Sequence, residues 1–217
     1  RSGININAIA QGSSELNISA VIHQQDISKA LNVLHEAFFL SDRKVLNLFL
    51  VGTGLIGKSL LNMMEKQHHQ LAKQNQLEIH VVGIANSRKM LFNEDGLKFT
   101  EAVNELLASN EEMNLNVFMG TMIAMNLSNS IFVDCTSSEE VTGFYESILS
   151  SNISIVTPNK KANSGSYQKY QTLRAAAKKR GVKFLFETNV GAGLPVINTL
   201  NDLLISGDKV IGIEAVL

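Results

Sequence analysis

The sequence has few of the residues that mark specialised protein classes. It contains one cysteine, Cys135, which excludes an internal disulfide framework. It has no apolar run close to the roughly 20 residues that a membrane-spanning helix needs. Neither sign of charge dominates, because 19 Lys and Arg residues stand against 20 Asp and Glu residues. We therefore expect an ordinary globular protein whose partners are neither nucleic acids nor membranes.

The two ends of the sequence also lack features. Residues 1–10 have no charged start, long apolar stretch or small-residue cleavage site, so no secretory signal is predicted and the cytoplasm is the expected compartment. Residues 209–217 predict a strand with no partner sequence after it. We expect the chain to be the middle part of a longer protein.

What is present begins with a small unit of two strands and a helix. Residues 4–10 and 15–22 alternate apolar and polar side chains around a turn at 11–14, which predicts paired strands. Apolar residues then recur at helical spacing, which predicts a helix capped by Asp26 with one buried face. That face consists of Ile27, Ala30, Leu31, Leu34, Ala37 and Phe38.

From residue 45 the pattern changes to short apolar runs, each followed by a polar or glycine-rich turn and a helical stretch. The runs cover 45–51, 79–84, 131–134, 153–156 and 182–186. Helices are predicted at 141–149, at 167–180 with Gly181 as the stop, from Pro195 to Leu204, and as short pieces within 86–130. Nearly continuous apolar strands are typical of a parallel sheet covered on both faces. The predicted fold class is therefore α/β, with a Rossmann-like, doubly wound and mainly parallel sheet.

The most informative motif follows the first of these runs and reads Gly-Thr-Gly-Leu-Ile-Gly at 52–57. Gly52 permits a tight turn, Gly54 lets the backbone approach a pyrophosphate, and Gly57 lets the next helix pack close to the strand. The free amides at the helix start would hold the phosphates. Its predicted inward face consists of Leu55, Ile56, Ser59, Leu60, Met63 and Met64. A glycine turn kept only for packing is the alternative.

The loop after the second run bears on cofactor choice. NAD-binding proteins place an acidic residue there, and this sequence has Asn86, Ser87, Arg88 and Lys89 instead. Asn86 and Ser87 can bind a ribose or phosphate, and the cations can neutralise a 2′-phosphate. This favours NADP, or tolerance of both NADP and NAD, over a merely solvated polar loop.

Two further turns follow apolar runs at the edge where open α/β sheets bind ligands. Thr136 and Ser137 either line the cofactor or cap the next helix. Cys135 is interpreted as a packed or cofactor-adjacent side chain and not as a catalytic thiol, since no histidine lies near it in the sequence. In the second turn Lys160 or Lys161 is a candidate, because a lysine there can reach a nicotinamide, a carboxylate or a developing alkoxide, and adjacent residues cannot both point inward. A surface charge before a helix is the alternative.

The turn at 187–195 is rich in glycine and carries one carboxylate. Free carbonyls beside Glu187 could chelate a hard cation, although a plain structural turn explains the same composition. The histidines show no metal-ligand spacing with Cys or acidic partners, so a histidine metal site is not expected. They are His23, His35, His68, His69 and His80.

Together these motifs closely resemble homoserine dehydrogenase. The matching segments are 51–57, 85–88, 133–138, 156–163 and 187–197. Residues 4–15 and the helix after them resemble the end of an ACT regulatory module of aspartokinase, so the combination resembles the bifunctional aspartokinase/homoserine dehydrogenase family. We accordingly divide the chain into an ACT-like part (1–41), an NAD(P)-binding Rossmann domain (42–188) and the start of a catalytic and dimerisation domain (189–217).

The resemblance implies reversible, NADP- or NAD-dependent reduction of aspartate 4-semialdehyde to homoserine, on the route to threonine and methionine. It implies cofactor contacts from Thr53, Leu55, Ile56, Thr136, Ser137 and Lys160, with Lys160 also the catalytic candidate. It further implies a sodium site formed by Glu187 and the carbonyls of Val190, Ala192 and Leu194, and a homo-oligomeric parent enzyme.

In the family the acidic substrate-binding cluster and the catalytic aspartate and lysine lie further along the sequence than Leu217. We therefore expect these 217 residues to bind cofactor without catalysing turnover. Two alternatives are a non-catalytic nucleotide- or amino-acid-sensing module, and an aspartate-semialdehyde dehydrogenase with Cys135 as nucleophile. The second is disfavoured because Cys135 lacks a partner.

Overall fold

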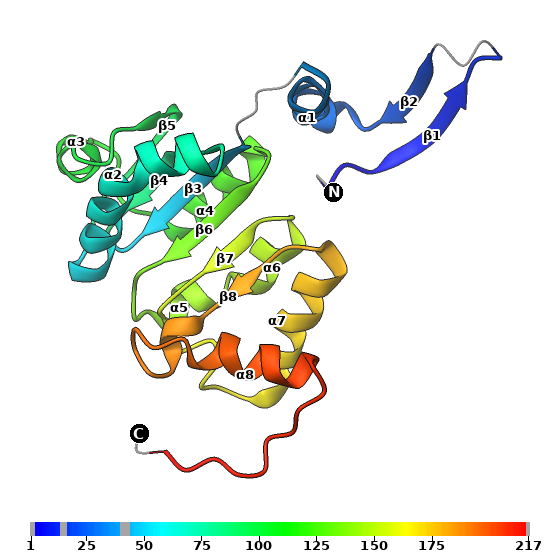
Figure 1. Ribbon diagram of the computed structural model, residues 1–217. Coiled ribbons are helices and arrows are strands. Elements are labelled where there is room, and N and C mark those ends of the chain that lie inside the picture. The colour runs from blue at the N-terminus through cyan, green and yellow to red at the C-terminus, as the bar shows by residue number, and fades with distance from the viewer. Residues whose placement is uncertain (1–2, 14–16, 40–43, 216–217) are drawn as a thin grey trace.

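The computed structural model describes residues 3–13, 17–39 and 44–215. The first part is an antiparallel hairpin of β1 (Ile6–Gln11) and β2 (Ile18–Ile22), which confirms the two paired strands. A short 3-10 helix, η1 (Gln24–Asp26), leads into α1 (Ile27–Phe39). Figure 1 shows α1 between the hairpin and the rest of the molecule. The predicted boundary between residues 41 and 42 lies outside the described residues.

The predicted buried face of α1 is wrong for the side chains that are described. Ile27, Leu31, Leu34 and Phe38 are all exposed, Phe38 to 73%. In the described part of the chain, no other element packs on this face. The sequence pattern identifies an apolar face correctly, but burial also requires a partner surface.

Among the side chains of α1 that the structure describes, the buried one is a lysine and not a leucine. Lys29 Nζ donates a hydrogen bond to Asn126 Oδ1 at 3.0 Å, and Asn126 Nδ2 donates to Asp26 Oδ1 at 3.0 Å. Burial lowers the pKa of Lys29, and the nearby Asp26 carboxylate partly opposes this effect. Asp26, expected as a helix cap, thus joins the start of α1 to Asn126, the residue that ends helix α4 (Leu115–Met125).

The second part is a six-stranded sheet in the order β5-β4-β3-β6-β7-β8. Its strands are β3 (Lys44–Val51), β4 (Leu77–Ala85), β5 (Met90–Leu97), β6 (Ser130–Asp134), β7 (Ser154–Val156) and β8 (Phe184–Leu185). All pairs are parallel except β4 and β5, which confirms the mainly parallel sheet. β5 was not predicted, because its charged centre, Glu94 and Asp95, resembles a loop and suits an exposed edge strand.

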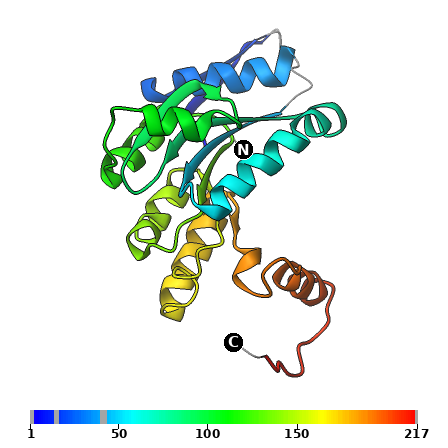
Figure 2. The ribbon, with the colours of Figure 1, turned by 90° about the vertical axis from the view of Figure 1, so that its left-hand side faces the viewer.

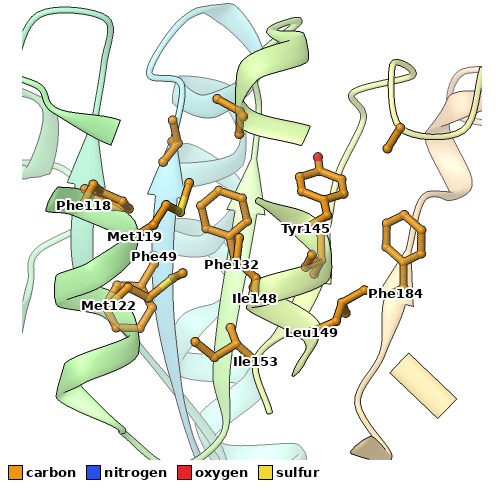
Figure 3. Packing of buried hydrophobic residues seen from close by; sticks show 14 of the residues in the cluster. Phe49, Phe118, Met119, Met122, Phe132, Tyr145, Ile148, Leu149, Ile153 and Phe184 are labelled. Carbon is orange, nitrogen blue, oxygen red and sulfur yellow. The ribbon is translucent and has the colours of Figure 1, made fainter. Parts of the chain in front are cut away.

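Helices cover the sheet on both faces. The covering helices are α2 (Leu55–Gln74), α3 (Ala102–Ala108), α4 (Leu115–Met125), α5 (Glu139–Thr142), α6 (Tyr145–Ser150) and α7 (Tyr167–Arg180). A 3-10 turn, η2 (Glu187–Asn189), leads to α8 (Val196–Ile205), which has no buried residue. One core cluster, shown in Figure 3, packs Phe49, Phe132 and Phe184 of the sheet against α4, α6 and α7. The other packs β3, β4 and β6 against α2 and α3. Burial on both faces explains the continuous apolar strands.

The helix predictions are confirmed for α7, which ends at Gly181 in a left-handed conformation (φ 68°), and for α8. The single helix expected at 141–149 is instead two short helices, α5 and α6. No described helix combines the length and the apolarity required to cross a membrane.

The strand expected from residue 209 is also wrong within the described residues. Residues 208–215 have no regular structure and, in Figure 2, follow α8 away from the sheet. A strand needs a neighbour for its backbone N–H and C=O groups, and no described strand lies beside this segment.

Candidate functional site

The glycine turn follows β3 and lies between β4 and β6, the two strands that flank β3 in the sheet. Gly52 N donates to Ala85 O at 2.9 Å, and Cys135 N donates to Val51 O at 2.8 Å. Gly52 has a φ of +99°, and a Cβ added there would lie 2.8 Å from the carbonyl of Cys135. The turn after β3 is therefore held between the ends of β4 and β6, and only glycine fits its first position.

The other two glycines of the motif differ in the space around them. A Cβ on Gly57 would lie 2.0 Å from Gly52 O, so this glycine lets α2 pack against the turn as expected. A Cβ on Gly54 would have no atom within 4 Å, and Gly54 caps α2 without a side-chain hydrogen bond. The start of α2 thus combines amides that no side chain caps with open space beside Gly54, which is the arrangement that binds phosphate.

The close contact at Gly57 also sets the rotation of α2. Gly57 and Leu61 are buried, whereas Leu55 is 88% exposed and Ile56 and Met63 are exposed too. The predicted inward face was therefore wrong at these exposed positions. Leu55 and Ile56 instead lie uncovered at the helix start, where the resemblance places cofactor contacts.

The loop after β4 divides its polar residues between two tasks. Asn86 Oδ1 accepts hydrogen bonds from Arg88 N at 2.7 Å and Lys89 N at 2.9 Å, which closes the turn. Lys89 Nζ donates to the carbonyls of Leu107 and Ser109 at the end of α3. Ser87 and Arg88 are exposed, and within the described residues the Arg88 side chain has no hydrogen bond or ion pair. Arg88 is thus the cation of this loop that remains available to a ligand.

A buried hydrogen-bond network lies at the ends of β6 and β7, and the sequence analysis missed it. The Asp134 carboxylate is fully buried and accepts from Tyr145 OH at 2.7 Å and Asn159 Nδ2 at 2.9 Å. Thr157 Oγ1 donates to Asp134 O and accepts from Asn159 N. Burial, followed by the charge of Asp134, raises the pKa of Tyr145 well above its usual range. The available signal was three polar residues, Asp134, Thr157 and Asn159, directly after buried strands.

The turn after β6 presents Thr136 and Ser137 at the same edge of the sheet. The helix cap expected from one of them is instead Ser138, whose side chain accepts from Val141 N. Thr136 N donates to Asp134 Oδ1 at 2.7 Å, and Ser137 is exposed. Burial, and to a smaller extent Asp134, raises the pKa of Cys135 to about 11. A thiol with this pKa is a poor nucleophile at neutral pH, which supports its interpretation as a packed side chain.

Lys160 follows Asn159 in the turn after β7. Both Lys160 and Lys161 are exposed, and Asn159 Oδ1 accepts from the backbone N of Lys161 at 3.1 Å. The turn is also fixed from the other side, because Asn189 Nδ2 donates to Asn159 O at 3.4 Å. Lys160 therefore lies on a rigid turn at the same edge as Thr136 and Ser137.

Glu187 has a structural partner that the sequence did not indicate. Its two carboxylate oxygens accept from Ile197 N at 2.8 Å and Asn198 N at 2.9 Å, so Glu187 stabilises the start of α8. The Leu194 carbonyl accepts from Val196 N. No group of three or more His, Cys, Asp or Glu suited to a metal exists among the described residues. Oxygen donors for sodium are present at Glu187, Val190, Ala192 and Leu194, and amides already bind the Glu187 carboxylate and the Leu194 carbonyl.

The structure thus brings most predicted residues together at one edge of the sheet. The glycine turn, the Asn86–Arg88 loop and the turns carrying Thr136 and Lys160 all follow the carboxyl ends of neighbouring parallel strands. The connection from β3 runs outward to β4 on one side, and the chain later continues through β6 on the other side. This reversal defines the switch point at which doubly wound sheets bind dinucleotides. The fold and the edge define a Rossmann-type dinucleotide-binding unit.

Comparison with known proteins places this unit in a family. The family model described as "Homoserine dehydrogenase, NAD binding domain" matches residues 52–187, and an ACT domain model matches residues 1–38. The chain therefore belongs to the homoserine dehydrogenase family, with the match to an ACT domain in front of the NAD-binding domain.

Relatives match this chain over its whole length. It is 43% identical over all 217 residues to the bifunctional aspartokinase/homoserine dehydrogenase of Haemophilus influenzae, and 39% identical to a chloroplastic one of Zea mays. It spans 26% and 24% of those two proteins, so about a quarter of their length. Among solved structures, a hyperthermophilic archaeal homoserine dehydrogenase in complex with NADPH has the same fold, with a TM-score of 0.60 at 24% identity over 75% of this chain and 50% of its own.

Proposed function

We propose that the carboxyl edge of the sheet binds NADP or NAD for a homoserine dehydrogenase that reversibly reduces aspartate 4-semialdehyde to homoserine. The observation that carries this proposal is the start of α2, where no side chain caps the first amides and the space beside Gly54 is open. The names of the relatives support the reaction, and the archaeal relative with NADPH supports the cofactor class. When bound, the nicotinamide supplies the hydride chemistry.

The residues of this chain would bind the cofactor and orient it. The α2 amides hold the pyrophosphate, and the loop after β4 holds the adenosine ribose. Thr136, Ser137 and Lys160 lie on the other side of the glycine turn and would line the nicotinamide half. Lys160 would place a positive charge near the carbonyl oxygen that becomes an alkoxide, which is its proposed catalytic role.

Arg88 should determine the choice between NADP and NAD. Because its guanidinium is exposed and free of described partners, we expect it to bind the 2′-phosphate. Arg88→Ala should weaken NADPH binding by roughly 1.5 to 3 kcal/mol and leave NADH binding almost unchanged. Lys89→Ala is the matched control, since Lys89 binds the end of α3. Calorimetric titration measures both, and an equal loss of NADPH and NADH affinity in Arg88→Ala would contradict this role.

We also propose a sodium ion at the turn around Glu187, supported by the oxygen donors there and by the family resemblance. A cation at this position would share the Glu187 carboxylate with the amides of α8. Thermal unfolding in sodium and in choline chloride at equal ionic strength tests this, because a bound ion stabilises the folded state. Equal unfolding temperatures in the two salts would remove the proposal.

Placement in the cytoplasm and a homo-oligomeric parent enzyme also remain proposals, and several plant relatives are described as chloroplastic. The alternative of an aspartate-semialdehyde dehydrogenase is weakened by the raised pKa of Cys135. A sensing role is favoured for the first part of the chain alone, through its match to the ACT family.

A further inference from the structure

We propose that Asp134, Tyr145, Thr157 and Asn159 are positioning residues that hold the nicotinamide half of the site together. This inference rests on the proposed dinucleotide binding and assigns a task to four residues of β6, α6 and the turn after β7, away from the loop after β4 that would hold the adenosine half. The network joins two turns, and each of these turns carries a candidate cofactor contact.

The two turns have no backbone ladder of their own. Pairing between β6 and β7 ends at Val133 and Val156, and the next amides, Cys135 N and Thr157 N, donate away from each other to Val51 O and Leu185 O. The described hydrogen bonds that join the two turns to each other therefore all involve side chains. Thr136 and Ser137 lie on one turn and Lys160 on the other. Their separation therefore depends on the groups that bridge the turns.

One buried carboxylate provides most of that bridge. Asp134 Oδ1 accepts from Thr136 N at 2.7 Å and thereby shapes the first turn. Asp134 Oδ2 accepts from Asn159 Nδ2 at 2.9 Å and from Tyr145 OH at 2.7 Å, which adds the second turn and α6. A buried charge is stable only when it is well bonded, and here three elements supply the donors.

Asn159 and Thr157 complete the connection. Asn159 Nδ2 also donates to Ser138 O at 2.9 Å, so one amide binds both the carboxylate and the far end of the first turn. Thr157 Oγ1 accepts from Asn159 N at 2.8 Å, donates to Asp134 O, and lies 3.1 Å from the Tyr145 hydroxyl oxygen, whose one proton goes to the closer Asp134 Oδ2. A fully bonded network of this kind makes its surroundings rigid.

Tyr145 connects this network to the core. Its ring is fully buried and packs edge-on against Phe132 and Phe184, while its hydroxyl reaches the two turns. Figure 3 shows the ring among the core side chains with the oxygen at its far end. Tyr145→Phe should therefore keep the packing and remove only the hydrogen bonds.

The location of the network predicts a selective effect. The adenosine half of the site lies at the end of β4, on the other side of the glycine turn. Loosening the turns after β6 and β7 should weaken a ligand that has a nicotinamide end. It should not affect a ligand that has only the adenosine end.

The experiment compares NADPH with adenosine 2′,5′-bisphosphate by calorimetry, in the full-length protein that contains this chain. Tyr145→Phe and Thr157→Val should each weaken NADPH binding roughly three- to thirtyfold and leave the bisphosphate unchanged. Thr157→Ser should restore NADPH binding, because it restores the hydroxyl. Tyr170→Phe is the matched control, since Tyr170 makes ring contacts and its hydroxyl has no described partner.

The outcomes distinguish a failure of the positioning role from a failure of the proposed cofactor binding. Equal loss of both ligands, or unchanged NADPH affinity with only a lower unfolding temperature, would overturn the positioning role. If the unmodified protein binds neither ligand, the proposed function fails instead.

Discussion

Replacing Gly57 with alanine is expected to lower the free energy of unfolding by about 3 kcal/mol, the upper end of the range for overpacking. The added Cβ would lie 2.0 Å from the backbone oxygen of Gly52 and 3.7 Å from Cys135 Cβ. The gain in helix propensity, about 1 kcal/mol, has the opposite sign and is smaller. Because the clash is with backbone, relief requires α2 to move away from the strand. Thermal unfolding should show a fall of roughly 6 to 12 °C.

Gly54→Ala is the matched control for this change. It lies three residues away in the same motif, has negative φ, and meets no atom within 4 Å. Its unfolding temperature should stay close to that of the unmodified protein. If Gly57→Ala and Gly54→Ala unfold at the same temperature, then the close packing of α2 on the turn is not a determinant of stability.

A polypeptide of these 217 residues is expected to bind NADPH and to oxidise homoserine at least about a thousandfold more slowly than the full-length enzyme. Orientation of reactants can supply roughly 7 to 11 kcal/mol, and positioned acid–base groups a further 10²- to 10⁴-fold. Of the groups that the family resemblance makes catalytic, the described residues contain Lys160 alone. One exposed lysine can provide part of the electrostatic contribution but cannot orient the substrate.

The two proteins should be assayed at equal concentration with homoserine and NADP at alkaline pH, after calorimetry has shown that both bind the cofactor. A rate for the 217 residues within tenfold of the full-length enzyme would show that they contain the catalytic groups. The interpretation of Lys160 as one member of a larger set of catalytic groups would then be wrong.

The sequence predicted the parallel sheet well because its signals are local. Apolar runs such as 45–51 and the stop at Gly181 depend on neighbours a few residues away. The failures concern properties that depend on distant partners. α1 has the expected apolar face but nothing described covers it, and 208–215 has strand composition without a neighbouring strand. The edge strand β5 was hidden by its charged residues.

In the candidate site, too, local features could be predicted from the sequence and contacts between distant residues could not. Gly52 and Gly57 were assigned correctly because a turn and a close approach each restrict one position to glycine, whereas the role of Gly54 stays a prediction. The separation of Arg88 from Lys89 could not be predicted, because Lys89 binds carbonyls 18 and 20 residues away. The partners of Asp134 lie 11 and 25 residues away, and Glu187 binds amides 10 and 11 residues away. Contacts at such distances leave no periodic signal in a single sequence.

The central claim is that the open start of α2 binds the pyrophosphate of NADPH, and Gly54→Val tests it most directly. The valine side chain meets no protein atom within 4 Å of its Cβ, and the extended backbone of Gly54 accepts any residue, so the fold should be unchanged. The branched side chain would occupy the space that the pyrophosphate needs. Calorimetric titration with NADPH should therefore show binding to the unmodified protein and none to Gly54→Val at an equal unfolding temperature. Equal NADPH affinity in the two proteins would contradict the account.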